Sequence, residues 1–224
     1  MKLLEPRLHA KWPQVASEVR RRIVSGELPP GSRLPTRPQL SKQFGISEGT
    51  TQAVLDELSR ARFIETRGRH GTFVTKHPPH LSHYGIAFPW EPAHENYWSK
   101  FHTAIRRAAE GIGLPPNCDS TIYVGAQEED SQQNFQRLRR DVETDRVAGL
   151  IFATAPYSYQ NTPVLDRPGI PRVAIMDEAE YTTMPRVYPD FAQWYRQAFD
   201  RMHAFYEKYG GATLVLFAAW KSRR

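Results

Sequence analysis

The sequence predicts a small helical domain closed by a hairpin, followed by an α/β domain with a doubly wound parallel sheet. Up to about residue 75, apolar residues recur at helical spacing and end in two short β-rich runs. From residue 84 on, short apolar runs alternate with helical patterns, which is typical of a parallel sheet with helical crossovers. We therefore expect a first domain over residues 1–76, a linker over 77–83 and a second domain over 84–224.

The positive charge is concentrated in the first domain. Residues 1–78 hold 14 Lys+Arg and 7 Asp+Glu, and residues 79–224 hold 16 and 17, which together give the totals of 30 and 24. A basic N-terminal domain on a neutral body is typical of nucleic-acid binding. A solvated basic face would give the same counts, so composition alone leaves both interpretations open.

Three helices are predicted in the first domain. The first carries an apolar stripe of Trp12, Val15, Ala16, Val19 and Ile23, and Gly26 is its stop signal. The second begins at a capping box of Thr36 and Gln39 and ends at Gly45. The third begins after the N-cap Ser47, with one apolar side formed by Thr51, Val54, Leu55 and Leu58.

A hairpin should follow the third helix. Residues 63–67 and 72–75 have the composition of two short strands, and they flank the tip Gly68-Arg69-His70-Gly71. Two helices joined by a tight glycine-containing turn and followed by a hairpin predict a winged helix-turn-helix. In this motif the second helix enters the major groove of DNA, N-terminal residues first.

We expect a double-stranded DNA operator as the partner of this domain. Basic residues outside the recognition helix should neutralise phosphates, namely Arg20, Arg21, Arg22, Arg33, Arg37 and Lys42. The wing should lie along the neighbouring backbone or minor groove. The expected DNA-binding residues are Arg33, Thr36, Arg37, Ser47, Glu48, Gly49, Thr50, Gln52, Arg67, Gly68, Arg69, His70 and Gly71.

Several motifs in fixed order resemble the GntR family of bacterial transcription regulators. They are Gly31-Ser32-Arg33-Leu34-Pro35-Thr36, Leu40-Ser41, Phe44-Gly45-Ile46-Ser47, Thr50, Leu55-Asp56-Glu57-Leu58 and Gly71-Thr72-Phe73-Val74. The resemblance covers about residues 12–75 and implies DNA-binding regulation, with repression expected by analogy. A structural or protein-binding winged helix is the alternative.

The departures from the family pattern concern base recognition. The family commonly has arginine at the positions of Glu48 and Gln52, and an arginine where this chain has Pro38. Glutamine pairs with adenine and glutamate accepts from the cytosine amino group, so the resemblance implies a changed operator. For Glu48 a second interpretation stays open, because acidic residues are also favoured by the dipole at a helix N-terminus.

The linker contains three histidines, His77, His80 and His83, within a polar, proline-containing stretch. They lack a neighbouring cysteine or carboxylate and a periodic element, so we expect ordinary linker histidines and no metal site.

The second domain is predicted as alternating strands and helices. Strands are expected at 84–88, 121–124, 147–152, 171–176 and 212–219, with a short extended piece at 186–188. Helices are expected at about 96–111, from about 128 and at about 191–209. Trp98 and Phe101 fit the core face of the first of these helices, and Asp190 fits a cap of the last.

This half resembles the sensor of LacI-type regulators, which has the periplasmic-binding-protein-like fold. The motifs are Tyr84-Gly85-Ile86-Ala87-Phe88, Gly149-Leu150-Ile151-Phe152-Ala153, Ile170-Pro171-Arg172-Val173-Ala174-Ile175-Met176-Asp177, Pro185-Arg186-Val187-Tyr188-Pro189-Asp190 and the helix ending Tyr209-Gly210-Gly211. The resemblance implies a homodimer and a small-molecule effector, such as a sugar, bound between two lobes.

Ligands of such sheets bind at the carboxyl ends of the strands. The expected ligand-binding residues are Phe88, Pro89, Trp90, Ala153, Thr154 and Asp177. For Asp177, a strand-end cap is an equally good interpretation. Only about 140 residues follow the linker, so we expect an incomplete first lobe that binds effector weakly or not at all. The alternative function is a DNA-binding dimerisation protein without a ligand.

Other classes are not supported. The sequence has no phosphate-binding glycine loop, Gly-x-Ser-x-Gly elbow or His-Glu-x-x-His motif, so we expect neither an enzyme nor a cofactor. Cys118 is the single cysteine, which fits a reducing cytoplasm and an inert thiol. The longest apolar run is 214–220, which is far shorter than the ~20 residues of a membrane-spanning helix.

Overall fold

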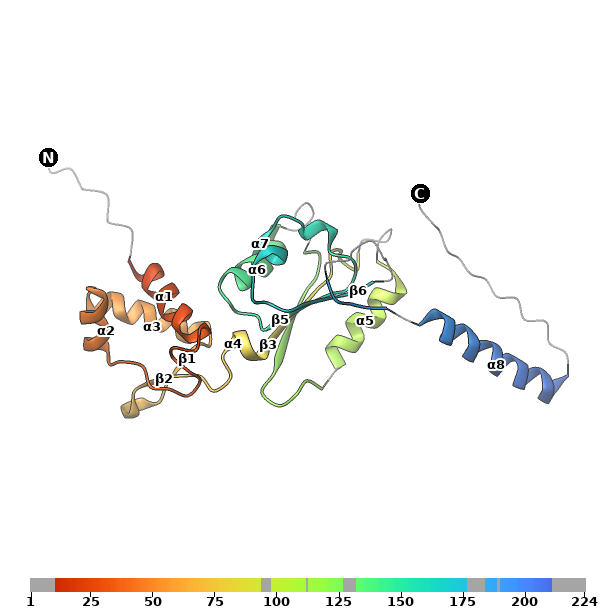
Figure 1. The fold of residues 1–224 in the computed structure, drawn as a ribbon, viewed down its shortest axis with the longest axis horizontal. Coiled ribbons are helices and arrows are strands. Elements are labelled where there is room, and N and C mark those ends of the chain that lie inside the picture. The colour runs from red at the N-terminus through yellow and green to blue at the C-terminus, as the bar shows by residue number, and fades with distance from the viewer. Residues whose placement is uncertain are drawn as a thin grey trace. The chain divides into compact units, whose positions relative to one another are not determined.

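The computed structural model describes residues 11–93, 98–111, 113–126, 132–176, 184–188 and 190–210. The chain divides into two compact units, residues 1–187 and residues 188–224. The first unit contains a winged helix-turn-helix and an α/β domain with a parallel sheet, and the second contains one described helix (Figure 1).

The N-terminal domain has the predicted order of elements. They are α1 (Trp12–Val24), α2 (Arg37–Phe44), α3 (Glu48–Arg60), β1 (Ile64–Thr66) and β2 (Thr72–Val74). The two strands pair antiparallel, with Ile64 opposite Val74. The predicted tip is tighter than a simple loop, because Gly68–His70 form a turn of 3₁₀ helix.

The apolar stripes meet in one core. All three helices and the hairpin contribute buried side chains to it, including Ala16, Val19, Ile23, Leu40, Val54, Leu58, Phe63 and Val74. Because α1 and α3 bury their apolar sides together, their polar sides face outward. The predicted helix faces are confirmed.

The expected linker contains a short helix that the sequence pattern did not predict. Residues Pro79–Ser82 form the short helix α4, and the Ser82 hydroxyl donates to the carbonyl oxygens of His77 (3.0 Å) and Pro78 (3.1 Å). Proline is well suited to the first turn of a helix, where its missing N–H costs nothing. The first strand of the sheet begins at His83, directly after α4.

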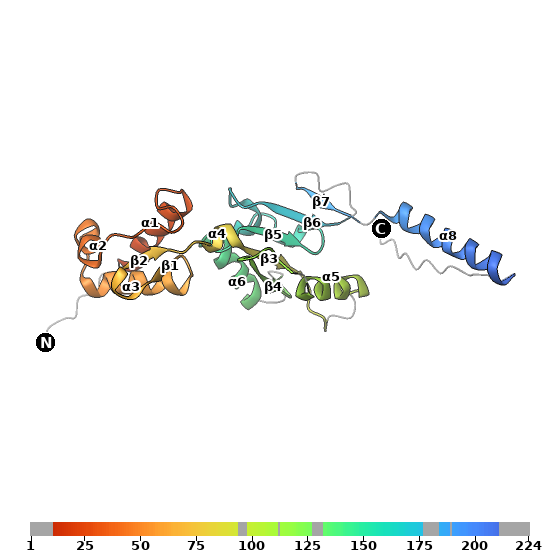
Figure 2. The same ribbon diagram turned by 90° about the horizontal axis from the view of Figure 1, so that it is seen from below.

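The second domain is built on a five-stranded sheet, all of whose neighbouring strands are parallel. Its strands are β3 (His83–Ala87), β4 (Asp119–Tyr123), β5 (Gly149–Phe152), β6 (Arg172–Ile175) and β7 (Arg186–Val187), in the spatial order β4-β3-β5-β6-β7 (Figure 2). The chain leaves β3 toward one side and returns to β5 on the other. The strand order therefore reverses between β3 and β5, and such a reversal is a topological switch point.

Helices cover both faces of this sheet. The helix α6 (Gln132–Glu143) buries Phe135, Leu138 and Val142 on one face, and α5 (Lys100–Gly111) lies against the other face with Ile105 and Ala109 (Figure 1). The alternation of Ile86 and Ala87 between the two cores follows from the two-residue period of a strand. The expected α/β class is thus observed.

Glycine at position 85 permits close packing inside the sheet. A Cβ there would lie 2.5 Å from Cδ2 of Leu150 on β5, nearer than side-chain atoms can approach. Any larger residue would force the side chain of Leu150 to shift within the core.

Some predicted bounds differ from the observed ones. The helix expected from about residue 96 begins at Lys100, and two short pieces, a 3₁₀ turn at Tyr157–Tyr159 and α7 (Pro163–Asp166), lie where no element was predicted. The strand expected at 212–219 lies outside the described residues.

The second unit contains the long helix α8 (Phe191–Tyr209), with the predicted bounds. The Asp190 carboxylate accepts from the backbone N–H of Gln193 (2.9 Å), which confirms the expected cap. None of the helices in the described part of the chain is long and apolar enough to cross a membrane.

Candidate nucleic-acid interface

Local structure fixes both ends of α2, a capping box at its start and a left-handed glycine at its end. The backbone N–H of Thr36 donates to Oε1 of Gln39 (2.8 Å), and the Thr36 hydroxyl lies 2.9 Å from the same oxygen. Gly45 ends α2 in the left-handed conformation (φ 60°), which glycine adopts without strain. The chain can therefore reverse sharply into α3.

The N-terminus of α3 is capped and attached to α2. The hydroxyl of Ser47 accepts from the backbone N–H of Thr50 (3.1 Å). Thr51 is buried, and its hydroxyl donates to the carbonyl oxygen of Ser47 (3.1 Å) and lies 2.7 Å from the Ser41 hydroxyl on α2. These bonds fix the orientation of α3 relative to α2. A helix-turn-helix that places its second helix in the major groove of DNA requires such a fixed orientation.

The first turn of α3 faces solvent on the side opposite the core. Ser47, Glu48 and Gly49 are exposed, while Thr50 and Gln52 are half-buried. The structure thus brings together on one exposed surface the residues that the sequence assigned to base recognition. Glu48 is in the first turn, where the helix dipole also favours an acid, so both interpretations of this residue remain.

The wing carries its basic residues in two different settings. Arg69 and His70 are exposed at the tip, whereas Arg67 hydrogen-bonds Glu65 and lies 4.6 Å from the centre of the Phe73 ring. Arg33 precedes α2 but is bridged to Phe73, so it lies beside the wing. A basic surface therefore extends from the α2 side to the tip of the wing.

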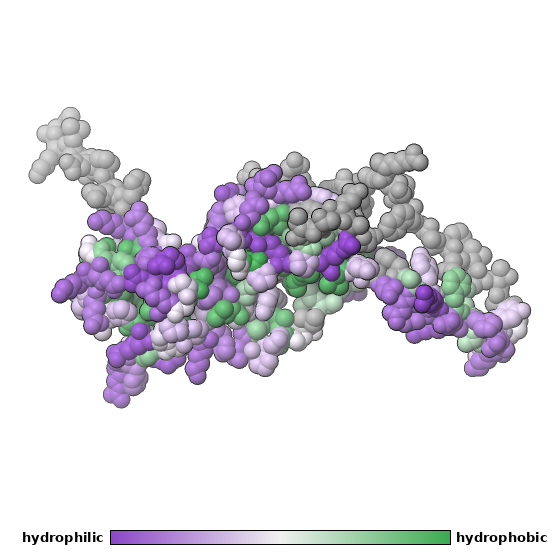
Figure 3. Space-filling model, viewed as in Figure 1, coloured by the Kyte–Doolittle hydropathy of each residue, from purple (hydrophilic) through white to green (hydrophobic). Residues whose placement is uncertain are grey.

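Three of the arginines expected on phosphates are engaged within the protein. Arg21 and Arg22 both donate to Glu18 (2.8 Å from each Nε), and these hydrogen bonds lower the pKa of Glu18 to about 2. Arg20 is half-buried with its guanidinium 5.7 Å from the centre of the Phe63 ring. Arg33, Arg37 and Lys42 are exposed, as a phosphate contact requires. The viewed face of the N-terminal domain is largely hydrophilic (Figure 3).

The residues expected to bind a small molecule are partly buried in the fold. Phe88 and Ala153 follow β3 and β5, and the N–H of Ala153 donates to the carbonyl oxygen of Ala87 (2.9 Å), so the two strand ends lie side by side. Phe88, Pro89 and Ala153 are buried, while Trp90 and Thr154 are half-buried. Asp177 lies outside the described residues.

An aromatic cluster surrounds His102 next to these strand ends. The centres of the Trp98, Trp90 and Phe88 rings lie 5.6, 5.7 and 6.5 Å from the centre of the imidazole. Burial lowers the pKa of His102, and its Nδ1 accepts from the backbone N–H of Ser99 (3.2 Å). Burial therefore favours the neutral ring, and the hydrogen bond from Ser99 places its proton on Nε2. Trp98 packs against the core as expected, but the same expectation is wrong for Phe101, which is exposed.

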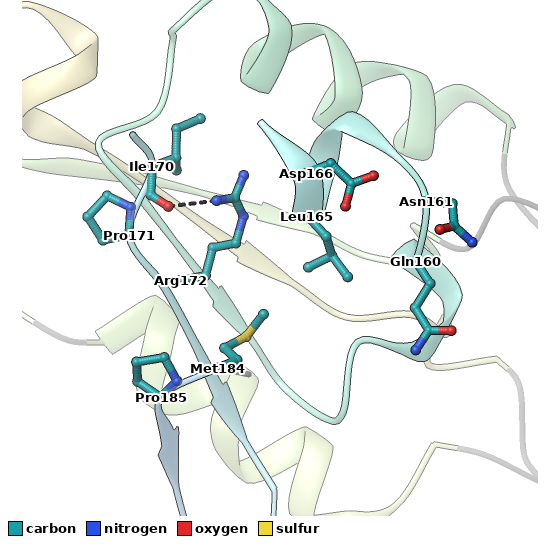
Figure 4. Close-up of a pocket in the computed structure, with 9 residues that line it drawn as sticks. All are labelled: Gln160, Asn161, Leu165, Asp166, Ile170, Pro171, Arg172, Met184 and Pro185. Carbon is teal, nitrogen blue, oxygen red and sulfur yellow. Dashed lines mark hydrogen bonds between the residues drawn. The ribbon is translucent and has the colours of Figure 1, made fainter. Parts of the chain in front are cut away.

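A cavity of about 700 Å³ lies elsewhere in the α/β domain (Figure 4). Within it, Arg172 donates to the carbonyl oxygens of Val164 (2.7 Å), Ile170 (2.7 Å) and Arg167 (2.8 Å), and burial lowers the pKa of its guanidinium. These bonds anchor the chain that enters β6. The lining residues, none of them expected from the sequence, are Gln160, Asn161, Leu165, Asp166, Ile170, Pro171, Arg172, Met184 and Pro185.

A polar junction between the winged helix and the sheet was not expected. Asp119, the first residue of β4, accepts from Arg62 after α3 and from Nδ1 of His83 on β3. The hydroxyl of Thr121 lies 3.1 Å from the other ring nitrogen of His83. His80 stacks on Phe63, with ring centres 5.9 Å apart. Two of the three linker histidines are thus packing and hydrogen-bonding residues, which only the tertiary contacts reveal.

The fold and the exposed α3 define the N-terminal domain as a DNA-binding winged helix-turn-helix. Residues 13–74 match the family described as bacterial regulatory proteins, gntR family. This part of the chain is a GntR-family DNA-binding domain.

Several curated regulators are similar to it. The HTH-type transcriptional regulator Rv1152 of Mycobacterium tuberculosis is 41% identical over 66 residues, which are 30% of this chain and 54% of that protein. The mannosyl-D-glycerate transport/metabolism system repressor MngR of Escherichia coli is 38% identical over 61 residues, 27% of this chain and 25% of that protein. The chain therefore spans about half, or less, of the length of these relatives.

Solved structures give the same kind of match. The N-terminal domain of AraR in complex with mutant ORR3 is 28% identical, with 33% of this chain and 100% of that chain covered and a TM-score of 0.29. AraR(DBD) in complex with operator ORX1 is 28% identical, with 34% and 90% covered and a TM-score of 0.29.

Proposed function

We propose that this chain is a sequence-specific transcriptional repressor that binds an operator through α3 and the wing. The observation that carries the proposal is the exposed first turn of α3, capped by Ser47 and held to α2 through Thr51. Its base-reading side chains would be Glu48 and Gln52. The similarity to regulators described as repressors supports the same role.

Selection of bound duplexes from random DNA tests this function. We expect the full chain to enrich one operator, and Gln52→Ala to weaken binding to it about tenfold in fluorescence anisotropy, since a base contact is worth ~1–3 kcal/mol. Arg139→Ala on α6 is the matched control, because that arginine pairs with Glu143 far along the chain from α3. Enrichment of no sequence, even at low salt, would contradict the proposal.

We infer further that the α/β domain controls DNA affinity through a small molecule of the sugar type. The adjacent ends of β3 and β5 at the switch point support this, because ligands of such sheets bind there. Phe88, Pro89, Trp90, Ala153, Thr154 and Asp177 remain the proposed ligand residues, in a cytoplasmic homodimer. A thermal-shift screen against sugars should then show a stabilised chain.

The burial of Phe88, Pro89 and Ala153 favours a second candidate function. In that case the α/β domain pairs two copies of the chain and binds no ligand. A flat thermal-shift panel, together with a dimer in sedimentation equilibrium, would support this function over the sensor.

A further inference from the structure

The side chain of Gln52 is held by a neighbour one helical turn away. Its Nε2 lies 2.7 Å from Oδ1 of Asp56, and both residues lie on the side of α3 opposite the buried Val54, Leu55 and Leu58. Arg60, one turn further on, pairs with Glu57 (2.6 Å). The carboxylate of Asp56 is thus directed to the glutamine amide.

This contact fixes which way the amide points. An ionised carboxylate can only accept hydrogen bonds, so the amide group facing Asp56 must be the NH₂ and not the carbonyl oxygen. One of the two N–H donors of Gln52 is used in this bond. The amide therefore retains one N–H and its oxygen for another partner.

The remaining pattern matches one purine and not the other. In the major groove, adenine presents an acceptor at N7 and a donor at N6, which one N–H and one oxygen can satisfy together. Guanine presents two acceptors, N7 and O6. A free glutamine could turn both N–H groups toward guanine, but an amide bound to Asp56 has only one left.

We propose that Asp56 is a positioning residue that makes Gln52 read adenine and reject guanine at one operator position. The inference rests on the proposed DNA-binding function. It assigns Asp56 no contact with DNA. Its effect is on discrimination between two bases and not on binding as such.

Two substitutions separate the hydrogen bond from the charge. Asp56→Ala removes both, whereas Asp56→Asn removes the charge but keeps an oxygen that can accept from Gln52. Both variants lose the same negative charge near the phosphates, so a general gain in affinity is common to them. Asp56 is exposed, so neither change should unfold the domain.

The experiment uses the full chain on duplexes selected by the wild type. We first locate the base pair whose replacement changes the affinity of the wild type but not that of Gln52→Ala. The adenine of this base pair is then replaced by guanine. We expect an adenine preference of about tenfold for wild type and Asp56→Asn, falling to threefold or less for Asp56→Ala, with circular dichroism unchanged.

The outcomes distinguish a failure of this inference from a failure of the proposed DNA-binding function. A wild-type chain that enriches no duplex overturns both. If the wild type binds its operator, three results would overturn the inference and leave the proposed function intact. Asp56→Ala could keep the full adenine preference, or Asp56→Asn could lose that preference as Asp56→Ala does. The third result is that recognition of no adenine depends on Gln52.

Discussion

His102 illustrates how burial sets the behaviour of one residue. Aromatic rings surround it and exclude water from the imidazole. Because the charged form is then poorly solvated, the pKa of His102 lies below the ordinary value of 6.5. Burial lowers the pKa of His80 in the same direction. The folded chain thus holds both rings neutral at a pH where the unfolded chain begins to take up protons.

The free energy of unfolding should therefore depend on pH in a defined direction. The contribution of the two histidines to this free energy is fully present above pH 6.5. It decreases as the pH falls below that value, because their protonation then favours the unfolded chain. His102→Asn keeps an acceptor for Ser99 but does not titrate, so its stability should fall less between pH 7.5 and 5.5. Urea denaturation at both pH values measures this.

His203→Asn is the control, because His203 is exposed on α8. Equal losses of stability for wild type and His102→Asn would contradict the assignment of a buried, neutral ring.

The sequence predicted the exposed side of α3 better than it predicted the surroundings of the basic residues of α1. The exposed side of α3 follows directly from the apolar positions on the other side. The pairing of Glu18 with Arg21 and Arg22 could also have been found, since residues three and four apart are neighbours on a helix. The burial of Arg20 against Phe63 could not, because it depends on a contact between distant segments.

At the scale of elements, the cap of α3 is a measurable part of the stability. Ser47→Ala should lower the free energy of unfolding by about 1 kcal/mol, because the N–H of Thr50 loses its acceptor. Ser47→Asn should lose much less, since asparagine caps helices equally well. Chemical denaturation compares the two variants, and equal losses for both would show that the lost stability does not come from the cap.

Two glycines of the proposed DNA-binding surface should respond oppositely to replacement by alanine. Gly71 in the wing has φ 104°, and a Cβ there would lie 3.0 Å from Nε of Arg33. Gly49 is helical, and its Cβ would meet only the Ser47 hydroxyl at 3.9 Å. Gly71→Ala should destabilise the domain by about 1 kcal/mol or more, and Gly49→Ala should stabilise it by about 0.5 kcal/mol.

Thermal denaturation of the two variants checks this prediction. A stabilised Gly71→Ala chain would mean that the wing does not hold Arg33 beside Gly71. Both variants are compared in stability only, because Gly49 and Gly71 both belong to the proposed DNA-contacting residues.

The elements with a strong period were predicted well, and those without one were not. The caps Thr36, Ser47 and Asp190 mark the starts of α2, α3 and α8 in the sequence as in the structure. By contrast, α4 and α7 have four residues each, too few to show a helical period. Proline begins both, and it is equally common in turns.

At the scale of the whole molecule, the junction of Arg62, His83 and Asp119 connects α3 to the sheet. Burial acts to raise the pKa of Asp119, but hydrogen bonds from Arg62 and His83 outweigh it, and the pKa lies below 3.8. The ion pair therefore persists at neutral pH, and its contribution is lost only as the pH falls through that lowered pKa.

A double-mutant cycle with Arg62→Ala and Asp119→Ala measures this connection. We expect a coupling energy of about 0.5–1 kcal/mol at pH 7, since the Asp119 side chain is 47% exposed and solvent screens the pair. The coupling should shrink in 1 M salt. Additive effects of the two substitutions at low salt would show that the junction does not contribute to stability.

The short helix α4 sets the length of the tether between β2 and β3. Residues 75–82 could reach ~26 Å if fully extended, but a helical turn of four residues advances only ~6 Å. Since β3 is hydrogen-bonded on both sides, the tether is attached to an inner strand of the sheet and not to an edge strand. While α4 stays helical, the winged helix and the sheet should therefore tumble together in solution. They should then show the same rotational correlation time.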